Sequence, residues 1–365
     1  MKKVLVLGGG GFIGGHLAKK LKTLDCFVRV VDLKYSEYFK VTEICDEFII
    51  KDLSESNGLD SLFKIEHIDK YPNLFKFYGN EFSVLYFDEV YQLAADMGGA
   101  GYIFTKLNDA NVMWNSSKIN LNIIEQCLKN NKPKIFYSSS ACIYPEHNQK
   151  DPENPNCRED SAYPANPDSE YGWEKLFSER LFLAFSRNHN LDVRIARFHN
   201  IYGPQSTWCG GKEKSPAAIC RKVAEINDSG EIEIWGNGLQ TRSFLFIDDC
   251  VDLVLKFMEQ NNFSGPVNIG SEEMVTINDL AQIVIQISGK KIQIKNIFGD
   301  EFVKKYGFEC PLGVMGRNSH NELFNKKVYH FQPKSLTYGM EKTYLWINEI
   351  YNSKKKYESK EKNTK

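Results

Sequence analysis

The chain of 365 residues lacks several features that would place it in a specialised class of protein. No apolar run approaches the roughly 20 residues that a membrane-spanning helix needs. The 46 basic residues are balanced by 47 acidic ones, so the net charge of -1 leaves no positive excess for nucleic acid or an anionic membrane. We also find no internal repeat. These absences favour a globular protein of one large or two small domains.

Cysteine and histidine are present, but not in the patterns that form disulfides or bind metals. The nine cysteines are odd in number, scattered, and include no C-x-x-C pair. This usage favours a reducing compartment, and we expect a cytoplasmic protein without a disulfide framework. The seven histidines show no H-x-x-x-H spacing, so we expect no metal site.

The chain begins with an apolar segment that runs into glycines. Val4–Leu7 is followed by the pattern G-x-x-G-x-x-G at Gly8, Gly11 and Gly14. Glycines let the backbone turn tightly and approach a pyrophosphate, which the N-terminus of the next helix stabilises. A second predicted strand ends at Asp32, where an acid would bind the ribose hydroxyls of a dinucleotide. The pattern therefore predicts a dinucleotide site, and the acid favours NAD over NADP.

More apolar segments continue the alternation of strands and helices. Four further strands are predicted, at 48–52, 89–93, 134–140 and 192–198. The first ends in Asp52, a second acid for the adenine end of the cofactor, and the next runs into small residues, including Gly98, that allow a ligand to approach closely. Residues 54–88 have no clear period, and we interpret them as a helix with an inserted excursion.

The order of these segments predicts an α/β fold: a Rossmann-type doubly wound parallel sheet with a smaller mixed α/β C-terminal substrate lobe. Two long helices, 108–130 and 169–189, have apolar residues on more than one side, and we predict that they form half of a four-helix bundle in a homodimer. The predicted division is an NAD-binding domain at 1–204 with 241–262 returning to it, a nucleotide-sugar lobe at 205–240 and 263–350, and a disordered tail at 353–365.

Three side chains suited to redox chemistry lie near the carboxyl end of the 134–140 strand. Ser140 ends that strand, and Tyr171 and Lys175 lie one turn apart on the following helix. With a nicotinamide cofactor, such residues move a hydride and a proton at a sugar hydroxyl. The spacing Y-x-x-x-K begins at four tyrosines: Tyr102, Tyr171, Tyr338 and Tyr351. Only Tyr171 follows the serine-bearing strand, so we interpret the other three as chance matches.

Six stretches together are similar to one known family. They are Leu93–Gly99, Ser139–Pro145, Arg197–Pro204, Gly210–Lys222, Gly238–Phe244 and Pro266–Val275. The chain resembles the extended short-chain dehydrogenase/reductase family that acts on nucleotide sugars. SSACIYP together with the GG-x-EK stretch is typical of those members that invert both C3 and C5 of a GDP-hexose, with GDP-mannose as the expected substrate.

The resemblance implies a role for particular residues. It implies that NAD is held by Gly8, Gly11, Phe12, Ile13, Gly14, Asp32, Asp52, Tyr171 and Lys175. It implies that catalysis uses Ser140, Cys142, Tyr171, Lys175 and Lys214. It implies that the GDP-sugar is bound by Gly98, Ser140, Ala141, Cys142, Asn200, Glu213, Lys214, Ser215, Lys222, Gly238, Leu239, Gln240, Arg242 and Arg317.

Cys142 and Lys214 would explain the inversion of a carbon, which requires proton removal on one face and return on the other. Their reference pKa values, about 8.5 for cysteine and about 10.4 for lysine, suit such a pair if the site tunes them toward neutrality. From the residues alone, Cys142 equally fits a small buried hydrophobe, the usual state of a free cysteine. NAD would then be regenerated when the hydride returns to C4.

Related activities make different demands on the same positions. A 4,6-dehydratase typically carries an acid after the serine strand, whereas Ser140-Ala141-Cys142 contains none. A simple 4-epimerase or 4-ketosugar reductase needs neither Cys142 nor Lys214, and a non-catalytic NAD-binding regulator needs no Ser-Tyr-Lys set. One departure from the family is Met315, which aligns with an arginine that contacts the diphosphate. A lost charged hydrogen bond typically costs about 1.5–3 kcal/mol, so a shifted affinity or substrate is expected.

Overall fold

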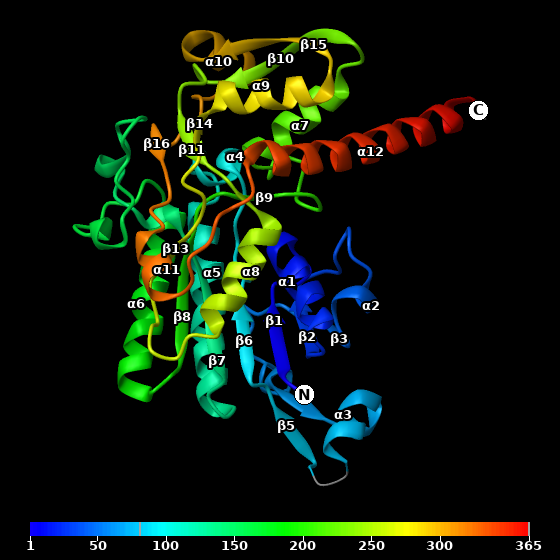
Figure 1. The fold of residues 1–365 in the computed structure, drawn as a ribbon, viewed down its shortest axis with the longest axis vertical. Helices are drawn as coiled ribbons and strands as arrows, with labels where there is room; N and C mark the ends of the chain where they lie inside the picture. Colours follow the sequence, from blue (N-terminus) through cyan, green and yellow to red (C-terminus); the bar gives the residue numbers. More distant parts are fainter. Residues whose placement is uncertain (80–81, 364–365) are drawn as a thin grey trace.

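The computed structural model describes residues 1–79 and 82–363 and shows two lobes, with the N-terminal lobe below the other in Figure 1. The lower lobe is built on a seven-stranded sheet in which every pairing is parallel. Its order is β13 (Val267–Ile269), β8 (Val193–Phe198), β7 (Lys134–Ser140), β6 (Glu89–Gln92), β1 (Lys3–Leu7), β2 (Phe27–Asp32) and β3 (Glu47–Ile50). The predicted Rossmann-type sheet is confirmed.

Helices cover both faces of this sheet, and β1 shows how the sequence achieves that. Val4 and Val6 belong to the hydrophobic cluster that includes α1 (Phe12–Thr23) and α8 (Ile247–Met258). Leu5 and Leu7 face the opposite way, into the cluster under α5 (Asp109–Lys129) and α6 (Glu170–His189). A strand that is buried on both faces needs consecutive apolar residues, and Val4–Leu7 of β1 provides them. The two long helices predicted from the sequence are confirmed.

The upper lobe is mixed, as predicted. Its parallel pair β10 (Ser229–Trp235) and β15 (Lys291–Ile297) packs with helices α7 (Ser215–Glu225), α9 (Ile277–Ser288) and α10 (Gly299–Tyr306). Two small sheets join the lobes: β14 (Met274–Thr276), β11 (Thr241–Ser243) and β16 (Gly316–Arg317) form one, and β9 (Ile201–Tyr202) pairs with β12 (Leu245–Phe246) in the other. Three short helices are α2 (Val41–Ile44), α4 (Ala100–Ile103) and α11 (Glu322–Lys327).

The excursion between β3 and β6 contains more structure than one helix. Its described part holds the antiparallel pair β4 (Lys64–Glu66) and β5 (Val84–Tyr86), α3 (Pro72–Tyr78), and 3-10 turns at Asp60–Phe63 and Ile68–Lys70. Leu74, Ile65 and Leu85 are buried against the edge of the sheet lobe. The hairpin escaped the sequence analysis because its strands are three residues long, too short to show a period.

Two parts of the predicted division are corrected. The segment 241–262 was expected to bring a strand back to the main sheet, but β12 pairs with β9 instead. The strand that returns is β13, which pairs with β8 and lies in the segment we had given to the second lobe. Gly265 lies just before β13 at φ +78, and a Cβ there would meet the carbonyl oxygen of Ile195, so the return passes close against β8.

The expected disordered tail at 353–365 is also corrected over its described part, because α12 runs from Leu336 to Asn363, while 364–365 lie outside the described residues. Lysine and glutamate dominate this end of the chain, and both have good helix propensity. Extending a helix that packing has already nucleated adds residues without a new nucleation cost. The last turns project away from the rest of the molecule (Figure 1).

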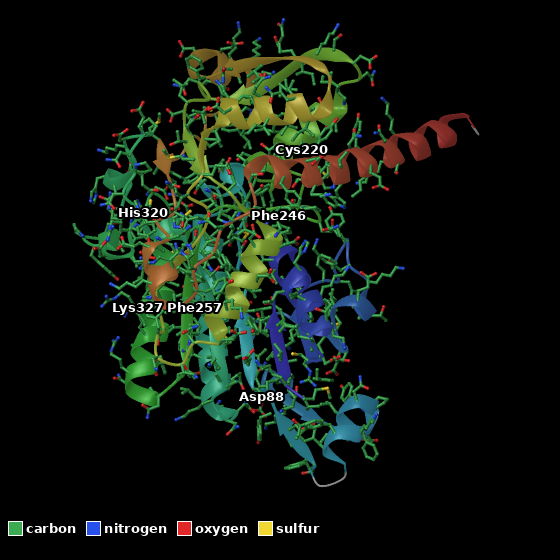
Figure 2. All side chains as sticks on the ribbon, viewed as in Figure 1. Asp88, Cys220, Phe246, Phe257, His320 and Lys327 are labelled. Carbon is green, nitrogen blue, oxygen red and sulfur yellow. The ribbon has the colours of Figure 1, made fainter. Side chains whose placement is uncertain are left out.

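One hydrophobic cluster runs through both lobes. It includes Phe257 on α8, Phe246 on β12 and Cys220 on α7, which follow one another from the lower lobe to the upper (Figure 2). The lobes therefore share a core. None of the helices in the described residues is long and apolar enough to cross a membrane.

Candidate active site

A cavity of about 670 Å³ lies at the carboxyl edge of the parallel sheet, between the two lobes. This is where open α/β sheets bind ligands. Its lining includes all nine residues predicted to hold NAD: Gly8, Gly11, Phe12, Ile13, Gly14, Asp32, Asp52, Tyr171 and Lys175. Residues from four separated segments of the chain, 8–14, 32, 52 and 171–175, thus converge on one space.

The glycine turn forms the floor of the cavity. Gly8 has φ +84, and a Cβ there would lie 2.7 Å from the backbone nitrogen of Ala94. A Cβ on Gly14 would overlap the carbonyl oxygen of Gly8, so α1 can begin this close to β1 only with glycine. Gly11 caps α1 without a side-chain hydrogen bond, which leaves backbone N–H groups at the helix N-terminus for a phosphate.

Asp32 connects the turn to β2. Its carboxylate accepts hydrogen bonds from the backbone nitrogens of Gly10 at 2.9 Å and Leu33 at 2.7 Å. Burial raises the pKa of Asp32, while these backbone donors act in the opposite direction. An open phosphate cradle beside an acid at the end of the second strand fits a dinucleotide such as NAD.

The redox residues meet where β7 ends against α6. Ser140 Oγ accepts the backbone N–H of Cys142 at 3.1 Å, which caps a 3-10 turn at Ala141–Ile143. Tyr171 lies in the first turn of α6, and Lys175 follows one turn later with Nζ donating to the carbonyl oxygen of Ser138 at 2.9 Å. Burial lowers the pKa of Lys175.

The electrostatics of Tyr171 differ from a simple Tyr–Lys pair. Burial, and then the nearby thiol of Cys142, raise the pKa of Tyr171, whereas Ser140 and Arg317 act in the opposite direction. Lys175 Nζ lies 5.7 Å from the centre of the tyrosine ring. The nearby ammonium therefore does not set the pKa of Tyr171 by itself, because removal of the phenol from water dominates.

Cys142 and Lys214 come from different lobes. Cys142 follows β7 and packs in a small cluster with Tyr171, Ile103 and Val112. Lys214 caps α7 and lines the cavity, where it keeps exposed surface although protein surrounds it. Partial removal from water lowers the pKa of Lys214, and the proximity of Cys142 acts in the opposite direction. Cys142 lies beside Tyr171 but does not line the cavity itself.

Arg317 gives the thiol an unexpected neighbour. Its guanidinium donates three hydrogen bonds, to Cys142 Sγ at 3.1 Å, Gln149 Oε1 at 2.6 Å and Asp168 Oδ2 at 2.9 Å. The Arg317 and Asp168 side chains are 6% and 5% exposed. Arg317 was predicted to contact the sugar nucleotide, yet each of its three nitrogens contacts the chain. Gln149 and Asp168 were missed, since no sequence spacing connects them to β16.

The remaining residues predicted to bind substrate fall into two groups. Gly98, Ser140, Asn200 and Lys214 line the cavity. The others lie outside its lining: Ala141, Cys142, Glu213, Ser215, Lys222, Gly238, Leu239, Gln240, Arg242 and Arg317. Arg242 is typical of the second group, since it donates to the carbonyl oxygen of Val314 at 2.7 Å. Burial and the adjacent Arg317 lower the pKa of Arg242 to about 10.

The sequence alone assigned no role in the cavity to Tyr102 or Lys212. Tyr102 was interpreted as a chance Y-x-x-x-K match, but its ring lines the cavity and lies 3.9 Å below the ammonium of Lys212. Its hydroxyl donates to Asp96 Oδ1 at 2.8 Å. Lys212 belongs to the Gly210–Lys222 stretch that carries part of the family resemblance. The contact between them depends on the meeting of the two lobes, which no local pattern reveals.

The fold and this cavity define an enzyme of Rossmann type, with Ser140, Tyr171 and Lys175 together at the carboxyl edge of its sheet. The family model described as NAD dependent epimerase/dehydratase matches residues 79–270. The chain belongs to this NAD dependent epimerase/dehydratase family.

Relatives and solved structures agree with that assignment. The GDP-mannose 3,5-epimerase of Arabidopsis thaliana is 40% identical over 348 residues, 95% of this chain and 82% of the relative. GDP-mannose 3,5-epimerase 1 of Oryza sativa subsp. indica is 39% identical, with coverage of 95% and 82%. A UDP-glucuronic acid 4-epimerase structure from Bacillus cereus, in complex with UDP-glucuronic acid and NAD, aligns with TM-score 0.73 and 22% identity over 96% of this chain and all of the other.

Proposed function

We propose that this protein is a GDP-mannose 3,5-epimerase that interconverts GDP-mannose, GDP-L-galactose and GDP-L-gulose. The observation that carries the proposal is the meeting of two sets of residues. The first set, Ser140, Tyr171 and Lys175, lines the cavity. Of the second set, Lys214 lines the cavity from the start of α7, and Cys142 packs directly against Tyr171 in the sheet lobe. A 4-epimerase needs only the first set.

The first stage concerns the C4 hydroxyl of the sugar. Tyr171 accepts its proton, and Ser140 orients the hydroxyl. The glycine turn, Asp32 and Asp52 would hold NAD, which would supply a reversible hydride acceptor next to C4. Lys175, fixed to the carbonyl oxygen of Ser138, places positive charge below the phenol, and this charge favours the phenolate in the reacting complex.

The second stage concerns the two carbons next to C4. A ketone at C4 makes the hydrogens on C3 and C5 acidic, so a base on one face removes a proton and an acid on the other returns one. Cys142 and Lys214 take these roles. The lowered pKa of Lys214 suits it, because a larger fraction of its amine is neutral near neutral pH. Return of the hydride to C4 restores the hydroxyl without net oxidation.

We also propose that the protein is a homodimer assembled through α5 and α6. Trp114 and Leu121 on α5 are 67% and 48% exposed, and Trp173 and Phe177 on α6 are 39% and 46% exposed. Their spacings, seven and four residues, give each helix an outward apolar stripe. Two copies of this helix pair would bury both stripes in a four-helix bundle. The nine free cysteines support a reducing, cytoplasmic location.

Two variants separate the stages. With GDP-mannose, the wild type should form GDP-L-galactose and GDP-L-gulose, separable by chromatography. Cys142→Ala should form neither product, yet still show transient absorbance of reduced nicotinamide, because Tyr171 and Lys175 are intact. Cys310→Ala provides a control, since Cys310 is another partly buried thiol but lies in the upper lobe. Normal product formation by Cys142→Ala would assign the thiol to packing.

A further inference from the structure

The segment that carries Lys214 is held on its α7 side by Glu213, whose carboxylate accepts the backbone N–H of Gly211 at 2.6 Å and pairs with Arg221 at 3.4 Å. It begins with Gly210 and Gly211, which have φ +93 and +89, and a Cβ on either would meet no atom within 4 Å. Glycines in open space leave a backbone many conformations. The backbone from Gly210 to Lys212 therefore gains from a further surface that holds it, since it leads directly to Lys214 in the cavity.

Gly99 provides part of that surface. Its backbone N–H donates to the carbonyl oxygen of Lys212 at 3.1 Å. A Cβ on Gly99 would overlap the carbonyl oxygen of Glu213 and lie 3.0 Å from its carbonyl carbon and 3.3 Å from the carbonyl oxygen of Lys212. The contact is backbone on backbone, so no side chain can rotate away to make room.

Tyr102 holds the same segment one turn later on α4. The ammonium of Lys212 lies 3.9 Å from the centre of the tyrosine ring, well inside the range of a cation–π interaction. The ring is itself fixed, because its hydroxyl donates to Asp96 Oδ1 at 2.8 Å, and Asp96 Oδ2 accepts from Asn115 Nδ2 at 3.0 Å. Asn115 lies on α5, so the chain of contacts runs back to the sheet lobe.

We propose that Gly99 and Tyr102 form a seat that positions Lys214 for proton transfer. The inference rests on the proposed function and gives the Gly98-Gly99 pair a second purpose. Gly98 lines the cavity, as expected of a small residue near a ligand, whereas Gly99 does not. Gly99 is a positioning residue: it touches the segment that carries the acid–base lysine and not the reacting atoms.

The physical part of the proposal is tested without substrate. Gly99→Ala should expel Lys212 and Glu213 from the seat and speed tryptic cleavage after Lys212 by about tenfold, because cleavage follows local opening. Gly101→Ala is the matched control on the same helix: its Cβ would meet only the carbonyl oxygen of Gly211, at 3.8 Å. Equal cleavage of the two variants would overturn the seat.

The functional part uses GDP-mannose in deuterated water. Gly99→Ala should lower deuterium incorporation at C3 and C5 at least tenfold while nicotinamide reduction changes less than twofold, whereas Gly101→Ala should change neither. Tyr102→Leu should lower deuterium incorporation as Gly99→Ala does. Tyr102→Phe keeps the aromatic ring under Lys212 and should retain most of the wild-type incorporation. Equal loss of reduction and exchange in Gly99→Ala would contradict the proposal. If the wild type shows no exchange, the proposed function fails. The tryptic cleavage comparison still tests whether Gly99 holds the segment at Lys212 and Glu213.

Discussion

Arg317 shows how one side chain from the upper lobe completes a site in the lower one. It lies on β16 and donates at once to the thiol of Cys142, to Gln149 and to Asp168. A buried guanidinium needs a counter-charge, and Asp168 supplies it. Arg317 is thus fixed beside the proposed acid–base thiol, and a thiolate formed there in the reaction would have a charged donor 3.1 Å away.

Asp168→Asn tests this arrangement. Removing one charge of a buried pair leaves the other uncompensated, which typically costs about 3–5 kcal/mol. The matched control is Asp160→Asn, because Asp160 pairs with Arg158 at the surface, where the side chains are 79% and 51% exposed. An exposed pair contributes less than about 1 kcal/mol. Urea unfolding of both variants should therefore differ clearly, and equal losses would show that the Arg317 pair is not strongly coupled.

His199 predicts a dependence of stability on pH. It is fully buried behind the active site, with Nε2 bonded to Asn268 Oδ1 at 2.9 Å, and burial lowers its pKa to about 3. An unfolded histidine has a pKa of about 6.5, so the unfolded chain takes up the proton first as pH falls. Stability from this group is complete above about pH 6.5 and is lost between that pH and about 3.

The change from about pH 7 to about pH 5 should cost about 2 kcal/mol through this group alone. His199→Gln keeps a side-chain donor for Asn268 but does not titrate. Urea unfolding of both proteins at several pH values measures the difference, and the variant should lose less stability on acidification than the wild type. Parallel curves for the two proteins would contradict the assignment of a strongly lowered pKa to His199.

The position of a site residue could be predicted where it depends on the sequence directly around that residue. Seven of the nine residues predicted to hold NAD lie in the glycine turn and the start of α1, at the end of β2 or just after β3, and all nine line the cavity. Arg317, Asp168 and Tyr102 were misjudged or missed because their roles depend on contacts between lobes. The Arg317–Asp168 hydrogen bond joins residues 149 positions apart. No spacing rule reaches that far.

Long buried helices and strands were predicted well from the sequence, whereas short or exposed elements were predicted poorly. The helices α5 and α6 and the strands from β1 to β8 in the main sheet follow strong apolar patterns. The β4–β5 hairpin and β13 have three-residue strands, in which a period cannot appear. The prediction of a disordered tail differs from the structure for another reason. A charge-rich composition suggests disorder, but a packed helix directly before the tail lets lysine and glutamate continue the helix.

The outward stripes of α5 and α6 make a prediction about assembly. Trp114→Lys combined with Leu121→Lys should convert a dimer of the 41.9 kDa chain to a monomer, because the charges would be buried at the centre of the bundle. Leu24→Lys is the control, since Leu24 is 53% exposed at the end of α1, on the other face of the sheet. Sedimentation equilibrium measures the mass. A monomeric wild type, or an unaffected double variant, would exclude this interface.

At the scale of the whole molecule, the two lobes share a core and, in the proposed function, divide the chemistry. Ser140, Tyr171, Lys175 and Cys142 lie in the sheet lobe, and Lys214 and Arg317 reach this region from α7 and from β16. The alternation of strands and helices was sufficient to predict the class of fold. It was not sufficient to place the upper lobe on the lower, since that depends on β13 and the small sheets between them.

The central claim is that both carbons next to C4 exchange their protons in this site. The most direct measurement is NMR of the sugar after incubation of the wild-type protein with GDP-mannose in deuterated water. The account predicts deuterium at C3 and at C5, with C4 keeping its original hydrogen because the hydride is returned. Retention of hydrogen at both C3 and C5, while nicotinamide is transiently reduced, would contradict it.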